Sequence, residues 1–332
     1  MPSPRLASTT AVLLAVLAGC GDDTETGSGA GGASASSAGT TTSTSTTGSP
    51  SSGADAGGSS GSGDGGAGST STGETTSTGG AGGAGGGTDD VCAGPRPGPD
   101  NTGVPAGVEL TPSGSITVEE DGAVIEGLDI EGMVTILADD VTIRNCRIRS
   151  SDYYPIRYFD EGNTGLVVED SEIEGLSEDV TAAISFENYT ARRLNVHGSA
   201  DGFKANANVL IEDCWVHDLG NYPEQHNDGV QSTGGRGVTI RHSDLSGASN
   251  AAVQTGDEGV ATEDLLIECS WLSGGGYTLN IRGSGDTVPR NTRILNNRFA
   301  RDSAYGPWTL DDPDPTVLGN VWDDDGEPIP YE

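Results

Sequence analysis

The sequence predicts an all-β protein whose folded part is a single-stranded, right-handed parallel β-helix (a solenoid) of about eight or nine coils. The main observation is a six-residue pattern that recurs eight times between residues 125 and 299, with a weaker ninth copy after them. Most copies begin and end with an apolar residue and carry a charged residue second. They begin at Ile125, Ile143, Val168, Ala191, Ile211, Ile240, Ile267 and Ile294, and the ninth begins at Val317.

The spacing of the copies is the second observation. Successive copies begin 18 to 29 residues apart, which is the period of a solenoid with loops of variable length. No segment shows a long 3.6-residue periodicity, so a helical solenoid is excluded. Parallel strands joined by short corners are connected in the right-handed sense in nearly all proteins, which predicts the hand of the coil.

The chain begins with a segment that we interpret as a targeting signal, residues 1–20. Arg5 is followed by an apolar run and then by Leu-Ala-Gly-Cys, which resembles the lipobox of bacterial lipoprotein signal peptides. The apolar run is too short to span a bilayer, so we expect cleavage before Cys20 and lipidation of its thiol. The alternative is an ordinary signal peptide cut nearby, which would release the protein.

Residues 21–90 are Gly, Ser, Thr and Ala with scattered acids, a composition that buries too little apolar surface to fold. We predict a disordered tether there. Residues 91–332 then form one β-helix domain, which we expect to be monomeric. Cys20 would anchor it in the bacterial cell envelope, in the outer membrane or at the cell surface.

Within each copy the first, fourth and sixth positions are mostly apolar or small, and the second and fifth are mostly polar. We interpret each copy as one six-residue strand with one face inward. Cys146 and Cys214 occupy the fourth position and Cys269 the third. Coils stack about 4.8 Å apart, so these three are too distant for disulfides with one another and are predicted to be buried small hydrophobes. Cys92 is assigned to a cap.

A second strand precedes most copies, and its third residue is polar and predicted to point outward. In a stack of coils these residues form one column: Arg157, Ser185, Lys204, Gln231, Gln254 and Asn280. Lys204 is the only lysine of the chain. Arg282 lies two residues beyond Asn280. Donors and acceptors at regular spacing suit a glycan, so we predict a substrate-binding groove containing Gln231, Gln254, Asn280 and Arg282.

The segments GPDNTGVPAGVELTP from Gly98, VIEGLDIEG, VTIRNCRI, HNDGVQSTGG and GGGYTLNIRG resemble bacterial right-handed β-helix proteins of the pectate-lyase-like superfamily. The resemblance covers roughly residues 99–330. It implies the fold strongly and the activity weakly, because the superfamily is similar in shape across lyases, hydrolases, epimerases and non-catalytic binders. Related lyases use Lys or Arg as the base, which implies that role for Lys204.

Asp201-Gly202 and Asp228-Gly229 align in adjacent coils, so the two carboxylates are expected about 5 Å apart. Three interpretations stay open. The pair can act as acid and base, it can bind Ca²⁺ through hard oxygens, or each Asp-Gly can simply build a corner in which Gly takes a positive φ. His226 precedes this strand and is a candidate proton donor.

Trp215 and Trp271 stand at the fifth position of their copies, where the other copies carry mostly charged or polar residues. Either a loop covers them or a sugar ring does. Two coils separate them, about 10 Å, which would match a disaccharide repeat. They are therefore further candidate substrate-binding residues.

The formal net charge of −34 argues against nucleic acid as a partner, because this field repels polyanions. Our first hypothesis is a polysaccharide-active protein. In the lyase form Lys204 is the base, Arg282 or calcium on Asp201 and Asp228 holds a uronate, and His226 protonates the leaving oxygen. In the hydrolase form Asp201 and Asp228 are the acid and base. The alternative is a non-catalytic glycan-binding, adhesion or purely structural surface protein.

Overall fold

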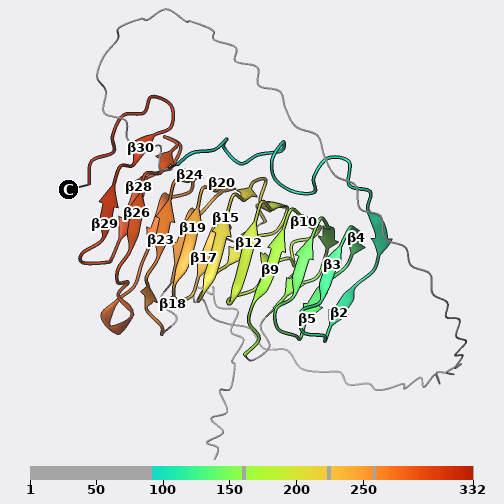
Figure 1. The fold of residues 1–332 in the computed structure, drawn as a ribbon. Helices are drawn as coiled ribbons and strands as arrows, with labels where there is room; N and C mark the ends of the chain where they lie inside the picture. Colours follow the sequence, from blue (N-terminus) through green and yellow to red (C-terminus); the bar gives the residue numbers. More distant parts are fainter. Residues whose placement is uncertain (1–91, 159–161, 223–225, 257–258, 332) are drawn as a thin grey trace, which may run out of the picture. The chain divides into compact units, whose positions relative to one another are not determined.

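The computed structural model describes residues 92–158, 162–222, 226–256 and 259–331, and in them the chain forms a parallel β-helix with three long sheets (Figure 1). Every ladder between strands of these sheets is parallel, so the predicted all-β fold class is confirmed. Within these residues the only helix is a short 3₁₀ turn, η1 (Gly285–Thr287), and none is long and apolar enough to cross a membrane. The predictions for residues 1–20 and 21–90 lie outside the described residues.

Sheet A has ten strands, each paired with the strand of the coil before and after it. They are β1 (Thr111–Ser113), β4 (Leu128–Glu131), β7 (Arg147–Ser150), β10 (Glu172–Gly175), β13 (Asn195–His197), β16 (Trp215–Val216), β20 (Asp244–Ala248), β24 (Trp271–Gly274), β27 (Arg298–Phe299) and β30 (Val321–Trp322).

Sheet B has nine strands and carries the polar column predicted above. They are β2 (Ile116–Val118), β5 (Val134–Ile136), β8 (Ile156–Arg157), β11 (Ala182–Ile184), β14 (Asp201–Lys204), β17 (Asp228–Ser232), β21 (Ala251–Thr255), β25 (Tyr277–Ile281) and β28 (Gly306–Leu310).

Sheet C also has nine strands, and a two-stranded sheet of β18 (Gly235–Arg236) and β22 (Thr262–Glu263) adjoins the solenoid. The strands of sheet C are β3 (Val124–Glu126), β6 (Thr142–Arg144), β9 (Leu166–Glu169), β12 (Tyr189–Arg192), β15 (Val209–Glu212), β19 (Val238–Arg241), β23 (Leu266–Glu268), β26 (Arg293–Leu295) and β29 (Thr316–Leu318).

Each six-residue copy is not one strand, as we had interpreted it, but a strand of sheet C followed by a corner and a strand of sheet A. The third residue of every copy has a left-handed φ, between 44° and 72°. These residues are Gly127, Asn145, Asp170, Arg193, Asp213, His242, Cys269, Asn296 and Gly319. The left-handed residue turns the chain, which is why the first, fourth and sixth positions point inward rather than the first, third and fifth.

The fourth position, just past the corner, forms a buried polar ladder inside the coil. The backbone amide of Cys146 donates to Ser171 Oγ at 3.0 Å, and the amide of Ser270 donates to Asn297 Oδ1 at 2.9 Å. The amide of Asn297 donates in turn to Asn320 Oδ1 at 3.0 Å. These side chains satisfy backbone groups that the corner leaves without ladder partners, so the small polar residues at this position are structural.

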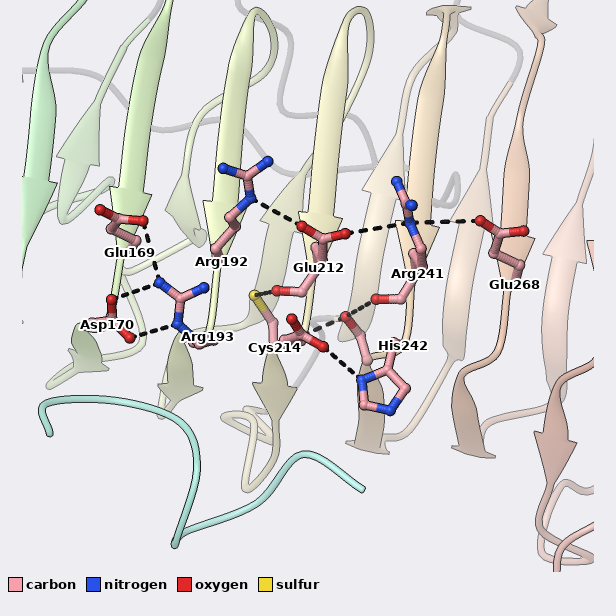
Figure 2. Close-up of polar contacts among 11 residues, drawn as sticks. Glu169, Asp170, Arg192, Arg193, Glu212, Cys214, Arg241, His242 and Glu268 are labelled. Atoms are coloured by element: carbon pink, nitrogen blue, oxygen red, sulfur yellow. Dashed lines mark hydrogen bonds and ion pairs between the residues drawn. The ribbon is translucent and has the colours of Figure 1, made fainter. Parts of the chain in front are cut away.

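The second position carries charges that alternate in sign along sheet C and pair between coils (Figure 2). Arg192 contacts Glu212 at 2.9 Å, and Arg241 lies between Glu212 at 3.4 Å and Glu268 at 3.5 Å. The side chains are partly exposed, so each pair contributes modestly. Their alternation nevertheless disfavours a slipped register, in which like charges would meet.

The segment 92–107 runs back along the solenoid from the β24 end towards β4 (Figure 1). Cys92 forms a disulfide with Cys269, Arg96 pairs with Asp244 at 2.5 Å, and the amide of Gly103 donates to Arg193 O at 2.8 Å. The prediction of an unpaired Cys269 was therefore wrong. Its left-handed corner position turns the side chain outward, where this segment passes.

Cys146 and Cys214 are free and buried, as predicted. Both are fully enclosed by the apolar interior, and burial raises the pKa of the Cys214 thiol to about 12. These two thiols are packing residues.

Replacing Cys92 with Ser is expected to lower the free energy of unfolding by about 2–5 kcal/mol, because the disulfide closes a loop between residues 177 apart. Denaturant unfolding followed by circular dichroism measures this. Adding a reductant should destabilise the wild type and leave Cys92→Ser unchanged. Equal stability of the two oxidised proteins would contradict the prediction.

Candidate functional site

The polar column predicted above is present on sheet B from Lys204 onward, whereas Ser185 is fully buried and its Oγ accepts from the Tyr158 amide at 2.8 Å. Lys204 pairs with Gln231, Gln231 with Gln254, and Gln254 with Asn280, each one coil from the next. Gln231, Gln254 and Asn280 are partly exposed, whereas the Lys204 side chain is only 11% exposed. The column thus begins at an enclosed lysine and continues as a row of accessible amides.

A second column lies beside the first, at the start of the same strands. The backbone amide of Asp228 donates to Asp201 Oδ1 at 2.8 Å, which confirms that the two aspartates lie in adjacent coils. Both are almost completely buried. The side chains of the two columns contact each other, so the site is two side chains wide.

Gly202 and Gly229 explain how an aspartate and a lysine three residues apart can face the same side. A Cβ on Gly202 would lie 2.3 Å from the Gly229 carbonyl oxygen, and a Cβ on Gly229 would lie 2.5 Å from that of Ala252. Neither glycine has a positive φ, so the interpretation of Asp-Gly as a corner with a left-handed glycine was wrong. The glycines are required because the coils approach closely at this bend.

Lys204 joins the two columns. Its Nζ donates to Asp201 Oδ2 at 2.6 Å and to Gln231 Oε1. In this arrangement Lys204 is the donor in both bonds, which is the opposite of what a catalytic base must do. The positive charge compensates that of Asp201 in a place where an unpaired carboxylate would be costly.

Asp228 has no such cation against it. Its oxygens accept from Asn250 Nδ2 at 2.9 Å and from Gln231 Nε2 at 3.3 Å. Burial first, and then the charge of Asp201, raise the pKa of Asp228 to about 7. Burial also raises the pKa of Asp201, against the opposing effect of Lys204. Asp228 therefore holds a proton through mildly acidic pH.

The amides continue the network away from the acids. Gln254 Oε1 accepts from Asn250 Nδ2 at 3.3 Å and from Asn280 Nδ2 at 2.5 Å, and Gln254 Nε2 donates to the Thr255 carbonyl at 3.0 Å. Asn280 Oδ1 has no hydrogen-bond partner among the residues that the structure describes. The amides of Gln254 and Asn280 are thus held in one orientation, and the row ends in a buried acceptor.

Two other predicted residues lie at the margins of the site. Arg282 follows the end of β25 and its Nε donates to Asp311 at 3.0 Å, so its charge is already compensated. His226 is exposed, and its charge acts on Asp201. Neither makes a described hydrogen bond to the column.

Trp215 and Trp271 are not part of this site. They lie on β16 and β24 of sheet A, because the left-handed corner turns the fifth position of each copy onto that sheet. Trp215 stacks on His217 with ring centroids 3.5 Å apart. Trp271 has the Arg96 guanidinium 5.9 Å from its ring, which fits the interpretation of cover by a loop.

Three residues of this face were missed by the sequence analysis: Asn250, Tyr277 and Tyr305. The register of Val253 with Leu279 puts Tyr277 beside Ala251, the strand partner of Asp228. Tyr277 precedes Asn280 by three residues, as Asp201 precedes Lys204, and that spacing was a usable signal. Tyr305 comes from a loop, where no repeat applies.

The aspartate pair does not fit a calcium ion. All four carboxylate oxygens already accept hydrogen bonds, and the Lys204 ammonium supplies positive charge there. Calcium takes six to eight oxygen ligands. Within the described ranges no group of three or more His, Cys, Asp or Glu residues is placed to hold a metal. These contacts argue against the aspartate pair as a calcium site, and we derive no step from calcium.

Comparison with known proteins supports the fold. Residues 105–261, somewhat less than half of the chain, match the family described as "Right handed beta helix region". No curated protein and no solved structure matches the sequence. The three parallel sheets and this match together show that the chain folds as a right-handed parallel β-helix.

Replacing Gly202 with Ala is expected to destabilise the protein by about 1–3 kcal/mol, because the new methyl group would meet the Gly229 carbonyl oxygen and the fully buried side chain of Val216. Gly114→Ala is the matched control, since a Cβ there has nothing within 4 Å and should change stability by less than about 0.5 kcal/mol. Thermal unfolding of both variants tests this. Equal midpoints would show that the bend tolerates a side chain.

Asp228→Asn is expected to remove a pH dependence of stability. The folded-state pKa is raised from 3.8 to about 7, so this group's stabilisation is present below the lower value and is lost as pH rises through the upper one. The stability of the wild type relative to the variant should fall by as much as about 4 kcal/mol between pH 4 and pH 8.

Denaturant unfolding of both proteins at a series of pH values gives this difference. Asp100→Asn changes an exposed aspartate and serves as the control, with no such change expected. A difference between wild type and Asp228→Asn that stays constant with pH would show that folding does not raise the pKa of Asp228.

Proposed function

We propose that this protein is a lipid-anchored glycan-binding protein of the bacterial cell envelope, and that the amide row of sheet B binds a polysaccharide. The observation that carries the proposal is the partly exposed row Gln231, Gln254 and Asn280, held at one-coil spacing by contacts with Lys204 and Asn250. Regularly spaced donors and acceptors suit the repeating hydroxyls of a sugar chain. The lipobox ending at Cys20 supports the anchor.

Binding fits the geometry better than β-elimination does. Lys204 would have to accept a proton from the substrate, yet its Nζ donates to Asp201 and Gln231 and is largely enclosed. Arg282, the residue assigned to the uronate carboxylate, is paired with Asp311. The lyase form therefore requires three existing contacts, two of Lys204 and one of Arg282, to be exchanged for substrate contacts.

Hydrolysis is a second candidate, because one observation favours it. Asp228 keeps a proton at mildly acidic pH, as the acid of a glycosidase must, and Asp201 in the adjacent coil is the second carboxyl group. The enclosure of both side chains weighs against it, since a glycosidic oxygen has to reach the acid.

Gln254→Ala and Asn280→Ala are expected to weaken glycan binding by about tenfold each, as expected for the loss of a hydrogen bond or two to the ligand. Calorimetry of the full chain against a panel of neutral and uronate polysaccharides measures the affinity. Asn195→Ala, which removes an amide on sheet A, is the matched control and should bind normally. Unchanged affinity of both sheet B variants would overturn the assignment of the row.

The same panel separates binding from cleavage. New reducing ends report any cleavage, and ultraviolet absorbance reports the unsaturated uronates that β-elimination forms. Turnover that is lost in Asp228→Asn while affinity is kept would establish the hydrolase. The lyase would be established if the wild type raises the absorbance and Lys204→Ala does not. Binding without either signal is the result that we expect.

A further inference from the structure

A pair of tyrosines lies at the C-terminal end of the neighbouring column, the one that contains Asp201 and Asp228. Tyr277 stands at the first position of β25, three residues before Asn280. Its ring centroid lies 5.6 Å from that of Tyr305, which directly precedes β28. Tyr277 is partly exposed and Tyr305 is 76% exposed, the most exposed large hydrophobic side chain in the described part of the chain.

The exposed Tyr305 is held in place. Its backbone amide donates to the Gly276 carbonyl at 2.8 Å. A Cβ on Gly276 would lie 3.4 Å from ring atoms of Tyr305, so the ring rests against the backbone there. The preceding residue, Ala304, is bound through its amide to Gly275 O at 3.0 Å. A fixed aromatic face loses little conformational freedom when a ligand packs on it.

The charges around this face disfavour an anionic ligand. Lys204 is engaged by Asp201, and Arg282 by Asp311. Asp302, three residues before Tyr305, is exposed, and the chain as a whole is strongly acidic. A uronate would meet no unpaired cation among the described residues of the two columns, so it would lose solvation without gaining an ion pair.

We propose that the ligand is a neutral hexose glycan, and that Tyr277 and Tyr305 form the subsite on which one of its sugar rings stacks. Adjacent amides then bind the hydroxyl groups, so the glycan runs across the strands, parallel to the solenoid axis. Pyranose rings have an apolar face that packs on aromatic rings, and apolar contact plus a few placed polar groups is the usual composition of a ligand site. This inference rests on the proposed glycan-binding function.

The test uses the full chain with neutral hexose oligosaccharides of increasing length and with galacturonate oligomers. Tyr305→Ala is expected to weaken binding of the neutral ligands by about tenfold, and Tyr305→Phe to bind like the wild type, because the ring rather than the hydroxyl makes the contact. Tyr331→Ala removes another exposed tyrosine and should bind normally. Tyr277→Ala should weaken binding as Tyr305→Ala does.

The outcomes separate the two proposals. Neutral glycans that bind wild type and Tyr305→Ala equally would overturn the tyrosine subsite and leave the amide row standing. Preferential binding of galacturonate oligomers would overturn the neutral ligand. Binding of no glycan at all would overturn the proposed function together with this inference. Circular dichroism of each variant establishes that the fold is retained, which the exposure of Tyr305 leads us to expect.

Discussion

The structure depends on one backbone constraint: a left-handed residue at the third position of every six-residue copy. That residue ends a strand of sheet C and starts one of sheet A, and it costs conformational energy wherever it is not Gly, Asn or Asp. Arg193, His242 and Cys269 adopt it nonetheless. Stacking with the neighbouring coils outweighs the preference of these residues for a negative φ. Their side chains point outward, where Arg193 contacts Asp170, His242 contacts Asp213 and Cys269 bonds to Cys92.

The same stacking rule explains which parts of the fold and site the sequence could predict. Residues at equal places in consecutive coils become neighbours, so Lys204, Gln231, Gln254 and Asn280 could be assigned to one column. The corner inside each copy does not change the spacing between copies. The spacing therefore could not predict that each copy contains a corner. Trp215 and Trp271 were predicted to bind the same substrate as the column, although they lie on sheet A and the column lies on sheet B.

Contacts made by non-repeating segments could not be predicted from the repeat. Cys92 meets Cys269 because segment 92–107 retraces the solenoid, and nothing in the periodicity specifies that path. Tyr305 belongs to the same category, since it joins the face from a loop after β27. Asn250 lies just before β21, and its Nδ2 donates to both Asp228 and Gln254. The repeat predicts the coil in which Asn250 lies, but it does not predict the direction of its side chain.

Lys204 determines the direction of the hydrogen bonds around Gln231. Its donation to Gln231 Oε1 fixes that amide so that Nε2 faces Asp228. Asn250 donates to both Asp228 and Gln254 Oε1, which leaves Gln254 Oε1 as the acceptor for Asn280 as well. A buried ion pair contributes little net stability, but it can select one arrangement among several. Here the lysine fixes the amide of Gln231, while Asn250 and the Thr255 carbonyl fix that of Gln254, so these two amides present defined donors and acceptors to a ligand.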